Sequence, residues 1–236
     1  TLESYQKLLD PNYLSVFGRS LWLAVLTTLL TLLIGYPFAY FTAGLPPKKR
    51  SLALMLVIVP FWTNSLVRIY GWMILLRGQG VVNSLLAALG LIDAPLKLLY
   101  NFGAVLVGMV YALIPFMILS VYNAVAKLDP VLIEAARDLG AGRWRAFWTI
   151  TVPMTRAGIM AGCVLVFIPS IGLFFISDLL GGSKTMLLGN LIRDELLTAR
   201  NWPLGAALSV VMMAATLLVI GGYRRLSGEK SLEGIV

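Results

Sequence analysis

Long apolar runs alternate along this chain with short polar segments. A helix that crosses a membrane needs about 20 mainly apolar residues, and several runs reach that length. The predicted membrane spans are residues 21–41, 52–75, 103–125, 158–180 and 204–222. The pattern therefore predicts an all-α integral membrane helix bundle, folded as a single transmembrane domain over residues 1–236.

The composition agrees with a lipid environment. Hydrophobic residues make up 59% of the chain and charged residues only 13%, whereas soluble domains carry about 25% charged residues. The net charge is +8, but the basic residues lie in short loops between apolar runs and do not gather on one soluble face. That distribution is typical of a membrane protein and argues against a nucleic-acid partner.

The basic residues also predict the orientation. Lys and Arg concentrate in cytoplasmic loops, and the segments richest in them all fall on one side of the predicted bundle. These are the loop at 48–50, the loop at 127–157 and the C-terminal tail from 224 onward. Residues 127–157 and the C-terminus are therefore predicted to be cytoplasmic. The first span then runs inward from outside, so we expect one further span before Thr1.

Enzyme chemistry finds little support in the sequence. The chain has no histidine and a single cysteine, Cys163, so the usual metal ligands and a Ser-His-Asp set are missing. Four of the predicted spans carry an internal proline: Pro37, Pro60, Pro115 and Pro169. Two interpretations of these prolines are open. They could reflect ordinary packing of a helix bundle, or they could form hinges beside a transport cavity.

The loop at 127–157 is predicted to form a helix-turn-helix outside the bilayer. Asp129 and Pro130 have the residue types of a helix N-cap and first position. The first helix would cover 131–139 and end at Gly140, which can adopt a left-handed conformation. It could serve as a docking surface or as an ordinary solvated loop.

A second short helix is predicted at 143–150, and we expect it to stop before Pro153. Trp144, Phe147 and Trp148 on this helix are residue types enriched at protein interfaces. The same aromatic residues would also suit contact with lipid headgroups.

The order of residues in this loop resembles the EAA loop of ABC importer permeases of type I. It reads Glu134-Ala135-Ala136, three residues, Gly140, nine residues, then Ile150-Thr151-Val152-Pro153. Val152 stands where the family pattern has leucine. Alanine-rich helices produce EAAxxxG by chance, but the complete pattern between two predicted spans is far more specific.

This resemblance implies that the loop docks on a cytoplasmic ATPase dimer. The residues implied in coupling are Glu134, Ala135, Ala136, Asp138, Gly140 and Arg143. ATP and Mg²⁺ would bind to the ATPase, since this chain lacks the GxxxxGK[ST] phosphate loop and needs no cofactor of its own. The resemblance also implies six spans, a sister permease, and a periplasmic or lipid-anchored binding protein in a bacterial plasma membrane.

Further segments at 60–70, 172–182 and 201–203 resemble the polyamine branch of this family, the B-type permeases of spermidine/putrescine importers. Related branches carry iron, phosphate or opines, so these substrates are alternatives. A secondary transporter is a weaker alternative, because the predicted spans lack the carboxylate relays expected of proton coupling.

Two charged residues fall within predicted spans, where charge is costly and usually functional. Asp178 could bind a substrate ammonium, or it could be a helix-end residue that pairs with a lysine or faces water. Arg68 would repel a polyamine and is therefore a poor ligand. Its remaining possible roles are snorkelling to the interface, a structural ion pair or a gate. The candidate pathway residues are Trp62, Asn64, Tyr111, Phe174, Ser177 and Asp178. Each aromatic member could equally pack against lipid.

Overall fold

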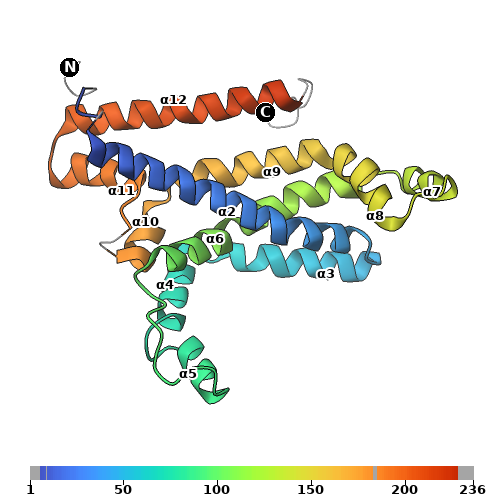
Figure 1. The fold of residues 1–236 in the computed structure, drawn as a ribbon, viewed down its shortest axis with the longest axis horizontal. Coiled ribbons are helices and arrows are strands. Elements are labelled where there is room, and N and C mark those ends of the chain that lie inside the picture. Colours follow the sequence, from blue (N-terminus) through green and yellow to red (C-terminus); the bar gives the residue numbers. More distant parts are fainter. Residues whose placement is uncertain (1–5, 9, 183–184, 228–236) are drawn as a thin grey trace.

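The computed structural model describes residues 6–8, 10–182 and 185–227, and every element within those ranges is helical. Four helices are long and apolar enough to cross a membrane. They are α2 (Pro11–Ala43), α6 (Phe102–Ala126), the continuous helix Arg143–Gly172, and α12 (Trp202–Ser227). These helices run along the long axis of the molecule (Figure 1). The predicted all-α membrane bundle is therefore confirmed.

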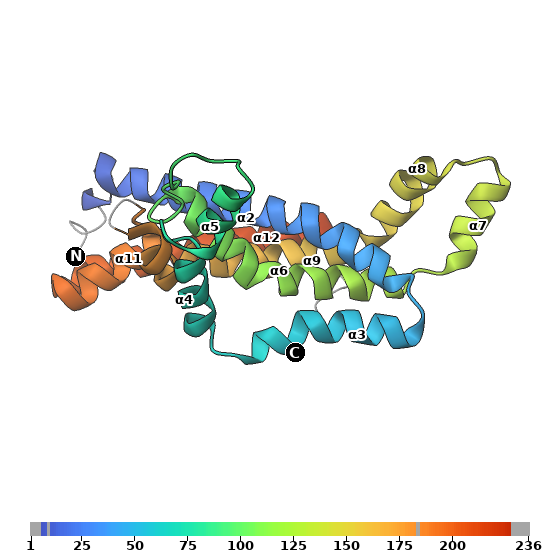
Figure 2. The ribbon, with the colours of Figure 1, turned by 90° about the horizontal axis from the view of Figure 1, so that it is seen from below.

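The shorter elements lie mainly at the two ends of this bundle and on one side of it. In chain order they are α3 (Pro47–Ile58), η1 (Val59–Trp62), α4 (Ser65–Leu75), α5 (Val81–Ala88), α7 (Pro130–Asp138), α10 (Phe174–Ile176), η3 (Ser177–Gly181), α11 (Leu188–Arg193) and η5 (Asp194–Thr198). The continuous helix Arg143–Gly172 consists of α8 (Arg143–Ala146), η2 (Phe147–Thr151) and α9 (Val152–Gly172). Figure 2 shows α7 and α8 at one end and α11 at the other. In the orientation predicted from the basic residues, the end that carries α7 and α8 is the cytoplasmic one.

The first long helix extends well beyond the predicted span. The Asp10 side chain caps α2 by accepting a hydrogen bond from the Asn12 N–H at 2.9 Å, and Pro11 occupies the first turn. Its 33 residues are about 50 Å long at 1.5 Å per residue, against a hydrocarbon core of about 30 Å. Both ends of α2 therefore reach into the polar regions.

Helix α6 forms the centre of the bundle, and its bounds match the predicted third span closely. Met109, Met117 and Val121 on α6 are completely buried. The helix packs against α2 and α9. Small residues allow α6 and α9 to approach each other closely. A Cβ on Gly158 would lie 2.3 Å from the Ala124 Cβ, and the Ser120 hydroxyl donates to the Gly158 carbonyl at 2.8 Å.

The predicted second span, 52–75, is a bent pair of helices with its break beside Pro60, one of the internal prolines noted above. Its two parts meet at an angle of 96°. Pro60 lacks an N–H for the helix ladder, and Thr63 is extended with ψ 151°. The Asn64 side chain then accepts from the Leu66 N–H at 2.8 Å and starts α4 as a new N-cap. The count of five spans holds when the bent pair is taken as one span.

The predicted end of the second loop helix before Pro153 was wrong. The helix that begins at Arg143 continues through the π-helical turn η2 into α9, ending at Gly172. In this turn the Val152 N–H bonds to the Phe147 carbonyl five residues earlier. A wider turn gives the proline ring room where an α-helix would bring it against a carbonyl.

The fourth span ends earlier than expected. It was predicted to reach residue 180, but α9 stops at Gly172, where Leu173 takes a non-helical ψ of 73°. The residues that follow form the separate turns α10 and η3. The fifth predicted span, 204–222, lies inside α12 and is confirmed.

We predict that Gly158→Ala destabilises the bundle. The new methyl group would collide with Ala124 Cβ and the Ser120 backbone carbonyl, and overpacking of this kind costs about 1–3 kcal/mol. Gly18→Ala in α2 is the matched control, because its Cβ would meet nothing within 4 Å. Thermal unfolding in detergent should show a lower midpoint for Gly158→Ala only. Equal midpoints would contradict the proposed α6–α9 contact.

Candidate functional site

The first candidate region is the cytoplasmic loop 127–157, called the coupling loop below. Asp129 caps α7 by accepting from the Val131 N–H at 3.0 Å. Gly140 has φ +83° and lies one residue past the C-cap Leu139, as expected for a left-handed stop. The predicted first helix and its two ends are therefore confirmed.

Helix α7 has no buried residue and projects beyond the bundle (Figure 2). Leu139 is 89% exposed, an unusual position for a leucine outside the membrane. The structure brings the predicted coupling residues onto this projecting segment. Glu134, Ala135, Asp138, Gly140 and Arg143 are exposed, and Ala136 is half-buried. Their contact with an ATPase remains a prediction.

An aromatic cluster fastens the coupling loop to the membrane helices. The Phe147 ring makes edge contacts with Tyr36 and Tyr40 of α2, at centroid distances of 5.7 and 5.6 Å. It also contacts Trp144 and Trp148 of its own helix. Phe147 therefore packs inward and is not a free anchor, whereas Trp144 and Trp148 are 77% and 62% exposed.

A buried hydrogen bond reinforces this junction. The hydroxyls of Tyr36 and Thr155 lie 3.1 Å apart, and Thr155 also donates to the Thr151 carbonyl at 2.7 Å. These contacts tie α2 to the start of α9 directly beside the π-helical turn. The sequence pattern did not identify Tyr36 or Tyr40, because their partners lie more than a hundred residues away along the chain.

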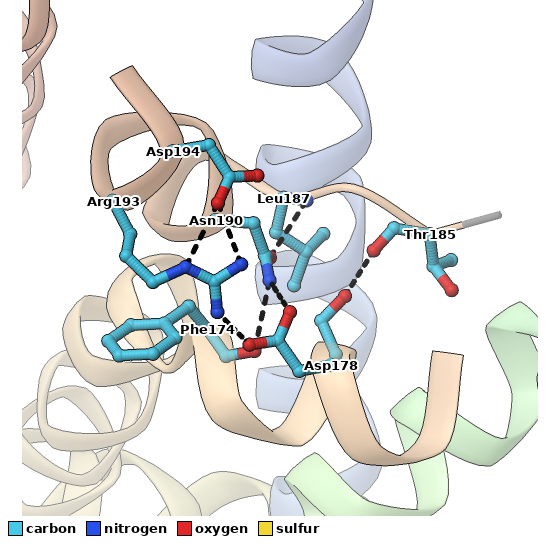
Figure 3. A network of polar contacts seen from close by, with 8 residues as sticks. Phe174, Asp178, Thr185, Leu187, Asn190, Arg193 and Asp194 are labelled. Atoms are coloured by element: carbon cyan, nitrogen blue, oxygen red, sulfur yellow. Dashed lines mark hydrogen bonds and ion pairs between the residues drawn. The ribbon is translucent and has the colours of Figure 1, made fainter. Parts of the chain in front are cut away.

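The second candidate region is a polar network at the opposite end of the bundle, formed by Phe174, Asp178, Asn190, Arg193 and Asp194 (Figure 3). Arg193 donates to Asp178 and, through Nε and Nη2, to one oxygen of Asp194 at 3.0 and 2.8 Å. Its guanidinium lies 5.2 Å from the Phe174 ring centroid. Hydrogen bonds to Asp194 and Asp178 raise the pKa of Arg193 above its ordinary value. One cation thus satisfies two carboxylates.

Asn190 holds the two halves of this network together. It is 4% exposed, and its amide donates to Asp178 and to the Phe174 carbonyl at 3.2 Å. Its oxygen accepts from the Leu187 N–H at 3.1 Å. The Leu188 N–H bonds to the Ser20 hydroxyl of α2 at 2.8 Å. The outer segment is therefore fixed to the bundle.

The predicted pathway residues separate into two sets. Phe174 and Asp178 belong to the polar network, and the neighbouring Ser177 is buried and donates to the Thr185 carbonyl. The other set is Trp62, Asn64 and Tyr111, around the break between α3 and α4. Tyr111 packs on Trp72 at 5.5 Å. Among the described residues, no hydrogen bond, ion pair or ring contact joins the two sets.

Sequence reasoning missed Asn190 and Arg193 as members of the network. Neither residue lies within a predicted span or a recognised motif. Asp178 does pair with a cation, but its partner is Arg193 and not the lysine that the sequence analysis considered. The sequence places Asp194 among the acidic residues outside the predicted spans, but it does not show that Asp194 shares Arg193 with Asp178.

Residues 35–228 match the family described as binding-protein-dependent transport system inner membrane component. The chain belongs to this family. It is therefore a permease component of the inner membrane, as the apolar spans and the EAA pattern indicated.

Curated relatives of this permease cover nearly all of it. The spermidine/putrescine transport system permease protein PotB of Escherichia coli is 49% identical over 98% of this chain and 85% of its own length. The protein of the same name from Haemophilus influenzae is 47% identical over 95% of this chain and 79% of its own. The molybdenum transport permease ModB of Azotobacter vinelandii is 27% identical over 74% of this chain and 76% of its own.

Solved structures share the fold of the permease. A chain of a bacterial alginate ABC transporter, in complex with its periplasmic protein, gives a TM-score of 0.78 at 19% identity, covering 94% of this chain and 82% of that one. A chain of the MetNI methionine ABC transporter gives 0.64 at 16% identity, with coverage of 93% and 98%. The arrangement of helices described above is thus the fold of ABC importer permeases.

We predict that Phe147→Leu loosens the coupling loop. Leucine keeps an apolar side chain but loses the two ring contacts with α2, worth together about 1–3 kcal/mol. Trypsin should then cleave the purified permease at Arg143 and Arg145 faster by a factor of roughly 5 or more. Trp148→Leu is the control, since Trp148 has a ring contact with Phe147 but none with α2. Equal cleavage rates in the two variants would contradict the fastening role of Phe147.

Proposed function

We propose that this permease is the membrane subunit of an ATP-driven importer that carries polyamines, spermidine and putrescine, into the cytoplasm. The observation that carries this proposal is the 49% identity to a spermidine/putrescine permease over 98% of the chain. The molybdenum permease reaches only 27%. Import of iron, phosphate or opines by the same machine is the alternative.

The importer would need three further components. A cytoplasmic ATPase dimer would bind ATP and Mg²⁺, because this sequence has no phosphate-binding loop of its own. A sister permease would complete the membrane part, and a periplasmic or lipid-anchored binding protein would deliver the polyamine. The family description already states dependence on a binding protein.

The exposed helix α7 would serve as the contact with the ATPase. Its charged residues and its exposed Leu139 form a surface without a partner in the described part of the chain. The aromatic cluster at Phe147 would carry movement of α7 to α2 and α9, because packed side chains transmit displacement. Glu134 would supply the charged contact, with Ala135 and Ala136 allowing a close approach.

The outer polar network would handle the substrate. Asp178 and Phe174 offer a carboxylate and an aromatic face, which are the two groups that bind an ammonium. Arg193 occupies this position in the structure. A substrate ammonium would therefore replace Arg193 at Asp178, while Asp194 keeps Arg193 neutralised. Entry of each positive charge gains about 2.3 kcal/mol per 100 mV of membrane potential.

Uptake of radiolabelled spermidine into proteoliposomes tests the proposed machine. The vesicles would contain this permease, its sister permease and the ATPase, with the binding protein added outside. Spermidine uptake should require ATP, and it should exceed uptake of phosphate, iron or an opine. ATPase stimulation without spermidine entry would contradict the substrate assignment and leave the importer class intact. Failure of any ATPase to associate would contradict the proposed machine.

We predict that Glu134→Lys abolishes this uptake. Reversing a charge at an interface contact costs about 2–5 kcal/mol, equivalent to a loss of roughly 30-fold or more. Asp93→Lys is the matched control, because Asp93 is an exposed carboxylate on the opposite side of the membrane. Rates of ATP hydrolysis and of spermidine uptake would be measured together. Normal uptake by Glu134→Lys would remove the coupling role of this residue.

We predict that Asp178→Asn slows spermidine uptake by at least ~10-fold, since a charge-assisted hydrogen bond contributes about 1.5–3 kcal/mol. Asp194→Asn is the control, because it removes one carboxylate from Arg193 but leaves Asp178 in place. It should cause a smaller loss. Assembly of the complex and basal ATP hydrolysis should be normal in both. Equal losses would assign the two carboxylates a shared structural role.

A further inference from the structure

The break between α3 and α4 exposes irregular backbone inside a membrane span. All residues from Pro60 to Asn64 are exposed, and Thr63 is extended. Figure 2 places this junction part-way along the length of the long helices. Lipid offers no hydrogen-bond partners, so non-helical backbone at that depth must be covered by protein or line a water-filled path. The face that carries the break therefore does not face lipid.

One turn beyond the break lies Arg68, which has no counter-charge among the residues that the structure describes. The Arg68 guanidinium carbon is 4.9 Å from the Phe61 ring centroid and 5.7 Å from that of Tyr111. Its Nε is buried and has no hydrogen-bond partner. Within the described part of the chain, the ion pairs involve Asp178 and Asp194 with Arg193, and none includes Arg68.

The two aromatic rings stabilise this cation but do not satisfy its N–H groups. A guanidinium has five donors in a plane that matches a carboxylate. A charged side chain left unpaired in a span is costly. The described residues therefore leave the acceptor of Arg68 to whatever covers this face.

The nature of the covering molecule follows from three observations. Lipid is disfavoured by the exposed backbone of the break, and a polyamine is disfavoured because it carries the same sign of charge. The surface around Arg68 is apolar and aromatic, with Trp62 82% exposed and Val67 and Tyr70 also exposed, which is typical of a protein interface. We infer that a second permease chain covers this face and supplies a carboxylate that pairs with Arg68.

This inference rests on the proposed function, which includes a sister permease. It adds that the interface between the two permeases contains an ion pair beside the transport path. The pair removes the positive charge of Arg68 from a route that a polycation would use. The break at Pro60 gives the carboxylate access, because it turns α4 away from the long helices (Figure 1).

A charge-exchange experiment on the assembled importer tests the pair. Arg68→Glu should reduce recovery of the sister permease with the tagged permease, and spermidine uptake, by at least ~10-fold. Each Asp and Glu in the membrane segments of the sister permease would then be changed to Arg in turn. One of these changes should restore both readouts in the Arg68→Glu background and impair them in the wild-type background. Arg77→Glu, an exposed arginine just beyond α4, should retain both.

Restoration also shows that Arg68→Glu folds and inserts, and Arg68→Gln provides a milder loss of the same contact. Defects that no sister substitution restores would overturn the inference. Defects that instead follow the content of phosphatidylglycerol in the vesicles would overturn it in favour of a lipid phosphate. If the wild-type permease recovers no second permease chain, the proposed importer fails as well. If it does and Arg68→Glu behaves normally, only the ion pair fails.

Discussion

A bilayer core offers no hydrogen-bond partners to a polypeptide backbone, and this constraint explains where the permease is regular and where it is not. Its long segments are helices because a helix satisfies its own N–H and C=O groups. Among the interruptions of the α-helical pattern, three matter for function: the break at 59–64, the π-helical turn at 147–151, and the stop at Leu173, which a second π-helical turn, η3, follows. Each departure carries an energetic cost that packing or function must offset. The first adjoins Arg68, the second joins the coupling loop to the bundle, and the third begins the outer polar network.

The π-helical turn makes the coupling loop part of a membrane helix. Because the helix from Arg143 continues to Gly172, a displacement at α8 is applied directly to α9. Phe147 adds a lateral connection to Tyr36 and Tyr40 of α2. Both helices pack on α6, which is the most buried of the long helices. The loop is thus connected to the centre of the bundle through rigid, close-packed elements and not through a flexible linker.

The sequence was sufficient for features that depend on local residues. Hydropathy located the long helices because burial in lipid averages over some 20 residues, and Asp129, Pro130 and Gly140 specified both ends of α7. It was insufficient where distant residues decide. Pro153 suggested a helix end, but the π-helical turn accommodates its ring. The size of the break at Pro60 was underestimated, although Asn64 is a good N-cap and could have indicated the start of a new helix. Asp178 was recognisable as a charged residue near a span end. Its partners Asn190 and Arg193 were not, since they approach only after the chain turns back beyond Gly181.

The two arginines of the proposed substrate route present different electrostatic situations. Arg193 is balanced within the chain by Asp178 and Asp194, so its end of the route has a net negative charge. Arg68 has no such balance in the described residues, although it lies in a span where an isolated charge is most costly. A route that admits polycations must keep its positive charges neutralised along its length, because like charges repel strongly where water is scarce. The outer end meets this requirement within the described residues, whereas the face at Arg68 needs an anion from outside them. Pairing of two permeases would then be a condition for the electrostatics of transport and not only for closure of the path.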